Sequence, residues 1–273
     1  GNLSSARIQM LNQSQIKQAA QFLLEEHDSR KPFGPFPEAF SPRSVDEAYA
    51  VQEAFMALRY ERQGPLGGYK IALTTAVMQR MVGFDSPAAG VVLANTIYES
   101  PTTLRGADFM RLGAECEIAI RLGTDISATE APHSRDSVSE AIIALMPAFE
   151  VIEDRKADYS NLFFPWTIAD NTWNAGAVLG PPVTDWHEID LVGARGTMTI
   201  NDELVGEGRG GDVLGHPVEA LVWLANTLAE RGQGLKEGLI VMTGSVVSTR
   251  FLNPGDIATV SVEGLGTARL QVT

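Results

Sequence analysis

One apolar stretch that carries two glutamates constrains the fold of this chain most. It runs from Ala114 to Ile120 and reads Ala-Glu-Cys-Glu-Ile-Ala-Ile. In a β-strand successive side chains point to opposite faces, so Glu115 and Glu117 would share one face and Cys116 would lie on the other. Residues two apart on a strand are separated by roughly 6.6 Å, and glutamate side chains can converge from there on one cation. The stretch therefore predicts a strand with a carboxylate pair on one side.

A third carboxylate, Glu150, follows an apolar run from Ala144 to Phe149 that predicts a buried strand ending near it. Ligation by carboxylates alone suits Mg²⁺, Mn²⁺ or Ca²⁺ rather than zinc or copper. Burying such a trio without a cation would be costly, so either Glu115 and Glu117 face water on a half-exposed strand or a cation lies among the three acids. The pattern alone leaves both alternatives open.

Lys70 is the second candidate for chemistry. It is an isolated cation in the apolar strand expected at residues 68–73. Its ammonium could extend to solvent along the sheet surface. The functional alternative is a desolvated lysine that binds a substrate carboxylate or donates a proton.

Composition narrows the class of protein. The 273 residues can bury a sizeable core, and 44% hydrophobic with 20% charged residues is typical of a globular chain. The net charge of -13 argues against nucleic-acid and anionic-membrane surfaces, which need clustered lysine and arginine. Cys116 is the single cysteine, which excludes a disulfide framework. Without a long apolar run or a signal sequence, we expect a soluble cytoplasmic protein.

The chain divides into two regions that differ in their pattern of apolar residues. Residues 1–65 predict a small helical lobe, with one amphipathic helix over 9–26 and a second from the capping box at Ser44 to Gly64. From residue 66 to 273, short apolar runs broken by Gly, Asn and Asp predict a β-rich body. Strands and helices do not alternate as βαβ units, so the fold class is α+β.

Several shorter patterns complete the expected body. A capping box at Ser137 predicts a helix, Asn201-Asp202 predicts a hairpin turn, and Pro217 opens a further helix. The glycines at 206, 208 and 211 match a dinucleotide fingerprint, but no strand leads into them and no helix follows at once. We interpret this segment as a flexible loop.

Six motifs in order resemble the fumarylacetoacetate hydrolase superfamily, and most closely its 2-keto-4-pentenoate hydratase and 4-oxalocrotonate decarboxylase branch. The resemblance covers nearly the whole chain. The motifs are Gly68-Tyr69-Lys70-Ile71-Ala72-Leu73-Thr74, Ala114-Glu115-Cys116-Glu117-Ile118-Ala119, Pro147-Ala148-Phe149-Glu150-Val151-Ile152, Ile168-Ala169-Asp170-Asn171, the stretch from Gly215-His216-Pro217 to Asn226, and Thr243-Gly244-Ser245.

The resemblance implies a mixed-sheet β-roll that binds Mg²⁺ or Mn²⁺ and a small 2-oxo acid, in a homo-oligomer. Chelation of such an acid by a metal stabilises the enolate formed during hydration or loss of CO₂. Lys70 would act as general acid or carboxylate anchor. The resemblance also implies roles for seven further side chains. The metal ligands would be Glu115, Glu117 and Glu150, and the substrate-binding residues would be Asp170, Asn171, Asn174 and Ser245.

The chain departs from this resemblance at Ala88. Hydratases of the branch usually carry an acidic residue after the proline of the turn that here reads Ser86-Pro87-Ala88. Alanine cannot transfer a proton, so either Asp85 supplies the acid or the reaction needs no base there. The expected function is a metal-dependent lyase, hydratase or decarboxylase. The alternatives are a C–C bond hydrolase of acylpyruvate or fumarylacetoacetate type and a non-catalytic 2-oxo-acid-binding protein.

Overall fold

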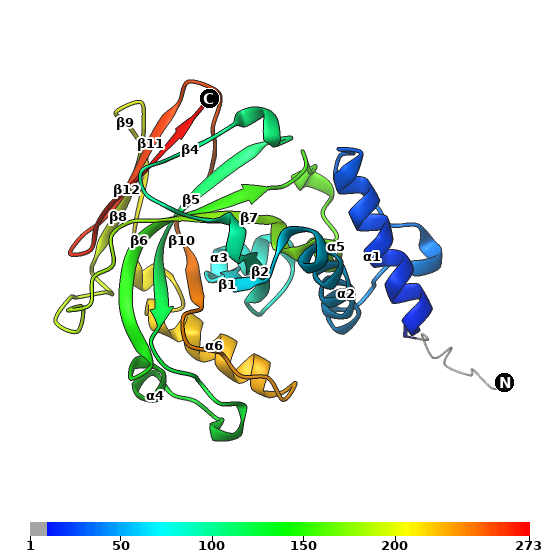
Figure 1. Cartoon of the computed structure of the whole chain (residues 1–273), viewed down its shortest axis with the longest axis horizontal. Coiled ribbons are helices and arrows are strands. Elements are labelled where there is room, and N and C mark those ends of the chain that lie inside the picture. Colours follow the sequence, from blue (N-terminus) through cyan, green and yellow to red (C-terminus); the bar gives the residue numbers. More distant parts are fainter. Residues whose placement is uncertain (1–9) are drawn as a thin grey trace.

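The computed structural model describes residues 10–273 and contains two mixed β-sheets with helices at one side and one end (Figure 1). The seven-stranded sheet has the order β2-β1-β10-β5-β6-β7-β3, and the five-stranded sheet has the order β4-β12-β11-β8-β9. The strands of the first sheet are β1 (Leu66–Ala72), β2 (Ala88–Leu93), β3 (Ile97–Glu99), β5 (Leu112–Leu122), β6 (Ile142–Glu153), β7 (Asn174–Leu179) and β10 (Ile240–Phe251). Those of the second are β4 (Thr102–Leu104), β8 (Arg195–Ile200), β9 (Glu203–Arg209), β11 (Ile257–Val262) and β12 (Gly266–Val272). The predicted α+β mixed-sheet fold is confirmed.

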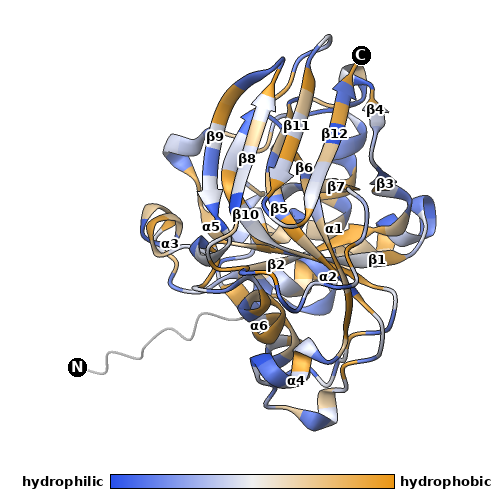
Figure 2. Ribbon diagram, turned by 90° about the vertical axis from the view of Figure 1, so that its left-hand side faces the viewer, coloured by the Kyte–Doolittle hydropathy of each residue, from blue (hydrophilic) through white to orange (hydrophobic). Residues whose placement is uncertain are grey.

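The main core lies between the two sheets. Cys116 and Ile118 of β5 are buried on the face that meets the second sheet, together with Met198 of β8 and Val260 of β11. Figure 2 shows hydrophobic and hydrophilic residues alternating along β11 and β12, which matches a sheet with one face buried and one face exposed. Because Cys116 faces this core, Glu115 and Glu117 necessarily face the opposite side of the first sheet.

The first sheet curls until its two ends meet. Although β2 and β7 lie far apart in the strand order, they contact one another. A second apolar cluster fills the inside of this curl. It consists of Val92, Ala119, Ala144, Met146, Ala148, Ala177, Leu179, Ile240 and Met242. The glutamates therefore lie inside a rolled sheet, not on an open surface.

The helices lie outside the sheets. They are α1 (Gln13–Asp28), α2 (Val45–Gln63), α3 (Ala76–Val82), α4 (Arg135–Ser139), α5 (Phe164–Ala169) and α6 (Pro217–Ala229). Helices α1 and α2 pack together, with Leu23 of α1 and Phe55 of α2 fully buried, and α2 packs on α5 of the body. In residues 10–273 no helix is both long and apolar enough to cross a membrane.

Several local predictions are confirmed. Helix α2 begins after Ser44, whose hydroxyl accepts the Glu47 N–H, and ends at Gly64. Helix α6 begins at Pro217. Asn201 and Asp202 join β8 to β9 with positive φ angles of 52° and 66°, as a two-residue hairpin requires.

Other local predictions were wrong at their boundaries. The helix expected from residue 9 begins at Gln13, and residue 9 lies outside the described residues. Ser137 does not open a helix, because Ser134 caps the short α4 and residue 142 already begins β6. The strand expected to end at Glu150 continues to Glu153. The Gly-rich segment at 206–211 is not a loop: β9 and a 3₁₀ turn occupy it.

Candidate metal centre and active site

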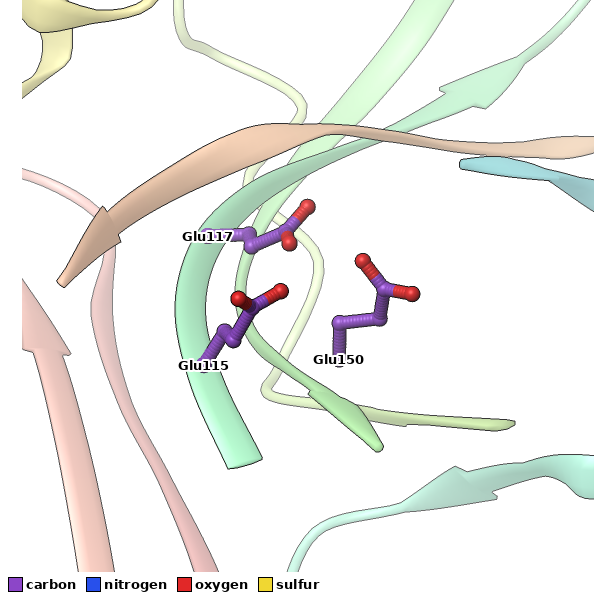
Figure 3. Close-up of side chains that lie close together, drawn as sticks. All are labelled: Glu115, Glu117 and Glu150. Atoms are coloured by element: carbon purple, nitrogen blue, oxygen red, sulfur yellow. The ribbon is translucent and has the colours of Figure 1, made fainter. Parts of the chain in front are cut away.

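The three glutamates converge from two neighbouring strands. In the antiparallel register of β5 and β6, Glu115 is directly opposite Glu150, and Glu117 lies two residues further along β5. Figure 3 shows Glu150 facing the other two across a small gap. One oxygen from each carboxylate lies within 4.8 Å of the others. Like charges in directly opposed positions destabilise a sheet unless something compensates them.

Burial makes this clustering electrostatically costly. Glu117 and Glu150 are fully buried, while Glu115 is partly exposed. Burial and the nearby Glu150 carboxylate raise the pKa of Glu117 well above its usual value. The same two causes raise the pKa of Glu115 to about 7. The alternative in which the two glutamates of β5 simply face water is therefore wrong.

Each carboxylate is oriented through one oxygen. The Glu117 Oε1 accepts the Gly244 N–H at 3.0 Å, the Glu150 Oε2 accepts the Asn174 amide at 3.0 Å, and the Glu115 Oε2 accepts the Thr249 hydroxyl at 2.7 Å. The other oxygen of both fully buried glutamates, Glu117 Oε2 and Glu150 Oε1, has no hydrogen-bond partner. Buried carboxylate oxygens without partners are rare because they lose hydration with no compensation. This donor set fits a hard divalent cation.

Lys70 provides positive charge beside the cluster. Its side chain is almost fully buried, and Nζ lies 3.3 Å from the Glu150 Oε2 and donates to the Thr172 carbonyl at 3.0 Å. Burial alone would lower the pKa of Lys70, but Glu150, followed by Glu115 and Glu117, raises it above the usual value. The lysine is therefore an ammonium that points into the site, and the alternative in which it extends to solvent is wrong.

A left-handed turn ahead of β7 places three groups against the site. Asn171, Thr172 and Trp173 have φ angles of 58°, 47° and 62°, which are unfavourable for residues other than glycine. The Asn171 side chain holds the turn by pairing with the backbone N–H and C=O of Val91 in β2. The turn thereby directs the Thr172 carbonyl to Lys70 and leads to Asn174, which binds Glu150. Strained backbone of this kind persists where surrounding structure enforces it, often at functional sites.

A cavity of about 230 Å³ opens beside the carboxylates. Its polar end includes Lys70, Glu115, Ser245 and Thr249. Apolar side chains from α3 and from the segment 159–173 form much of the remaining wall. They are Met78, Met81, Val82, Leu162, Phe164 and Trp173. A cavity with a few convergent polar groups at one end and an apolar wall is typical of a small-molecule site.

Comparison with known proteins decides the family. A sequence model described as Fumarylacetoacetate (FAA) hydrolase C-terminal matches residues 74–273, and these include both β5 and β6. The chain belongs to the fumarylacetoacetate hydrolase family. The predicted membership is thus confirmed.

Individual members of the family extend the likeness over nearly the whole chain. A 2-keto-4-pentenoate hydratase of Paraburkholderia xenovorans is 30% identical over 94% of this chain and 94% of its own length. A 4-oxalocrotonate decarboxylase of Pseudomonas putida is 29% identical over 94% of this chain and 96% of its own length. These enzymes confirm the predicted hydratase and decarboxylase branch.

A solved member of the family has the same fold. It is a 4-oxalocrotonate decarboxylase from Pseudomonas putida G7, complexed with magnesium and adipate. It is 25% identical to this chain, with a TM-score of 0.89, and the match covers 97% of this chain and 100% of the decarboxylase. The expected β-roll with its N-terminal helices is thereby confirmed.

The structure brings only some of the predicted site residues together. Lys70, Glu115 and Ser245 line the cavity. Asn174 does not line it, but its side-chain amide donates a hydrogen bond to Glu150. Asn171 does not line the cavity, because its side chain pairs with the backbone of Val91.

Two predicted acids lie elsewhere. Asp85 is exposed in the turn before β2 and does not line the cavity. Asp170 is buried between the His27 ring at 2.6 Å and the Arg155 guanidinium at 3.1 Å, away from the cavity wall. Arg155 is itself almost fully buried, so it is not part of a surface ion pair. Ala88 is fully buried in β2 opposite Ala72.

Sequence reasoning missed Thr249, the Gly244 N–H and Trp173. Thr249 and Gly244 belong to β10, which pairs with β5 through an irregular register, so no local pattern could place them beside Glu115 and Glu117. The only signal for Trp173 was its position two residues after the Ile168-Ala169-Asp170-Asn171 motif.

Proposed function

We propose that this protein is a divalent-metal-dependent lyase, a hydratase or decarboxylase of a small 2-oxo or 2-hydroxydienoic acid such as 2-hydroxypenta-2,4-dienoate or 4-oxalocrotonate. The two unpartnered buried oxygens of Glu117 and Glu150, in one cluster with Glu115, carry the proposal. The names of the hydratase and decarboxylase relatives support the reaction class.

In this proposal Glu115, Glu117 and Glu150 would hold Mg²⁺ or Mn²⁺. Such a cation would chelate the 2-oxo acid head and stabilise negative charge on its enolate. The relative solved with magnesium, and a second structure of it with calcium and acetate, support a hard divalent cation. One oxygen of each carboxylate lies within 4.8 Å of the others, and the Gly244 N–H and the Asn174 amide each hold one oxygen of Glu117 and Glu150, which supports this assignment.

Lys70 would hold a proton close to the substrate head. Its ammonium stays charged because Glu150 lies 3.3 Å away. It can therefore attract the substrate carboxylate or donate a proton to the developing carbanion. The apolar wall of the cavity would exclude water around the acid, which strengthens these interactions. Ser245 lines the same end and can donate a hydrogen bond to a substrate oxygen, while the Thr249 hydroxyl donates to Glu115.

Steady-state assays with 2-hydroxypenta-2,4-dienoate and with 4-oxalocrotonate, each with Mg²⁺ and with Mn²⁺, test the proposal. We expect turnover of at least one substrate that is lost on chelation and in Glu115→Ala. No turnover of either substrate would sink the lyase function. The appearance of two acid fragments from an acylpyruvate would instead indicate the C–C hydrolase, a secondary alternative given the names of the relatives.

The buried Ala88 favours a second candidate, a non-catalytic 2-oxo-acid-binding protein, because the site has metal ligands but no acid at that position. This candidate requires tight binding of oxalate or pyruvate without any product. Calorimetry combined with product analysis separates the two functions.

The proposal extends to the organisation of the chain. Residues 1–65 would form a helical lobe and residues 66–273 the metal-binding catalytic domain, in a cytoplasmic homo-oligomer that binds neither nucleic acid nor membranes. The packing of α1 on α2 and the β-rich texture of the remaining chain support this division. Light scattering at micromolar concentration tests the oligomer, and a monomer would contradict it.

A further inference from the structure

The cavity wall carries positive charge at only one end. Among the described residues that line it, Lys70 is the sole cationic side chain, and it lies beside Glu150 at the carboxylate end. The charges of the three glutamates, Lys70 and a divalent cation would cancel. Once the head carboxylate has bound, the site would therefore carry a net negative charge and would repel a second carboxylate.

Two guanidinium groups lie in this part of the fold without facing the cavity. Arg111 binds both oxygens of Asp154, at 2.8 and 2.7 Å, and Arg155 is buried against Asp170. Neither side chain lines the cavity. Their charges are thus neutralised by buried aspartates and are not available to a ligand.

The polar atoms that remain free along the wall are neutral. The hydroxyls of Thr74 and Thr167 and the indole N–H of Trp173 are buried and have no hydrogen-bond partner, and all three residues line the cavity. Such groups can hydrogen-bond an oxo or hydroxyl oxygen, but they do not compensate for the desolvation of a second carboxylate. The wall therefore accepts neutral polar groups of a ligand but disfavours a second carboxylate.

The cavity has room for a tail. A cavity volume of about 10–15 Å³ is enough to hold one water molecule. The cavity volume of about 230 Å³ therefore leaves room for a tail beyond the few atoms of a chelating head. Met81 of α3 lines this cavity while 80% of its surface is exposed, as expected of a side chain at the mouth. An apolar tail that reached Met81 would remove hydrophobic surface from water.

We propose that this protein selects 2-oxo or 2-hydroxydienoic acids with an uncharged apolar tail and rejects acids that end in a second carboxylate. This inference rests on the proposed function, which includes both monocarboxylic and dicarboxylic acids. It narrows the substrates to alkyl-substituted monocarboxylates. It favours a hydratase of alkyl dienoates over a decarboxylase of dicarboxylates.

Calorimetric binding to the Mg²⁺-loaded full chain tests the inference without turnover. The probes are oxalate, 2-oxohexanoate and 2-oxoadipate, of which the last two have equal chain length and differ in a terminal carboxylate. We expect oxalate and 2-oxohexanoate to bind and 2-oxoadipate to bind at least about tenfold more weakly. If oxalate binds but 2-oxoadipate binds as tightly as 2-oxohexanoate or more tightly, the proposed selectivity is overturned while the proposed function stands. Failure of oxalate to bind would overturn the proposed function with it.

A charge added at the mouth provides the matched variant. Met81→Arg places a guanidinium on the exposed part of the wall and should shift the ratio of the 2-oxoadipate to the 2-oxohexanoate dissociation constant at least about tenfold toward the dicarboxylate. The control, Val77→Arg, adds the same charge on the same helix at a residue that is 57% exposed and does not line the cavity. An equal change of this ratio in both variants would overturn the inference, because the overall electrostatic field of the protein, and not the cavity wall, would then set the selectivity.

Discussion

At the scale of single residues, the site is a balance between burial and charge. Glu117 and Glu150 are fully enclosed, yet each leaves one oxygen without a partner. Lys70 offsets part of the negative charge and is held in place by Glu150 and the Thr172 carbonyl. The cluster is therefore strained electrostatically, and relief of that strain by a cation is the physical reason for proposing the trio as a metal site.

Glu117→Gln separates metal binding from stability. The amide keeps an oxygen for the Gly244 N–H but removes a ligand charge. We expect Mg²⁺ affinity to fall by more than about 100-fold, and the chelated protein to gain about 1–3 kcal/mol because folding no longer has to bury or protonate that carboxylate. Calorimetry and urea unfolding in EDTA measure the two effects. Glu203→Gln, an exposed glutamate in β9, should change neither.

Metal binding should also depend on pH. Because the pKa of Glu115 is raised to about 7, and burial and Glu150 raise that of Glu117 well above its usual value, the metal-free cluster holds protons that a cation must displace. Those protons are bound in the folded state more than in the unfolded state, so the metal-free fold loses stability as pH rises through 7.

The thermal shift between Mg²⁺-loaded and chelated protein measures this linkage. We expect the difference in Tm to grow as pH rises from about 6 to about 8. Calorimetry in two buffers of different ionisation enthalpy should show proton release on Mg²⁺ binding that declines over the same range. A shift independent of pH would contradict the assignment of the raised pKa values.

At the scale of elements, the left-handed turn at residues 171–173 links the two ends of the curled sheet. It precedes β7, while its Asn171 side chain binds the backbone of β2. Gly90 in β2 allows the close approach, since a Cβ there would collide with Thr172 and press on Lys70. The turn thus closes the roll and at the same time positions Lys70.

Asn171→Ala tests this link. The substitution leaves the Val91 N–H and C=O without partners inside the protein, so we expect a loss of about 2–5 kcal/mol in the free energy of unfolding. Asn95→Ala removes a single hydrogen bond from an exposed asparagine to the Gln63 carbonyl and should cost less than about 1 kcal/mol. Urea denaturation compares the two variants. Similar small losses would show that the turn is held by other contacts.

At the scale of the whole molecule, a buried ion pair joins the N-terminal helices to the body. Asp170 follows α5 and contacts both Arg155 and His27, which comes from α1. Burial alone would raise the pKa of Asp170, but Arg155 and then His27 lower it below the usual value. The stabilisation from this carboxylate is therefore present above the unfolded pKa and is lost as pH falls through the folded one.

Asp170→Asn should weaken the docking of α1 and α2. Because Arg155 would be left as a buried charge without a partner, we expect about 3–5 kcal/mol of destabilisation, measured by urea unfolding. Asp28→Asn provides the control on α1, since the Asp28–Arg62 pair is half exposed and should be worth less than about 1 kcal/mol. Comparable losses in both variants would refute a special role for the buried pair.

Local backbone geometry explains what could be predicted. Alternation along β5 placed Glu115 and Glu117 on one face, and capping residues such as Ser44 marked where α2 begins. These features depend on neighbours in sequence, so they are readable without the fold. The chemistry of three carboxylates indicated the kind of metal before any distance was known.

Only the tertiary structure decided which polar residues meet. The β5–β6 register set Glu150 opposite Glu115, closure of the sheet brought Thr172 to Lys70, and the contact with His27 holds Asp170 away from the cavity wall. These outcomes depend on contacts between residues that are 35 or more positions apart, whose pairing no local pattern encodes. By itself the sequence determined the ligand chemistry, while long-range packing determined the geometry and the charge balance of the site.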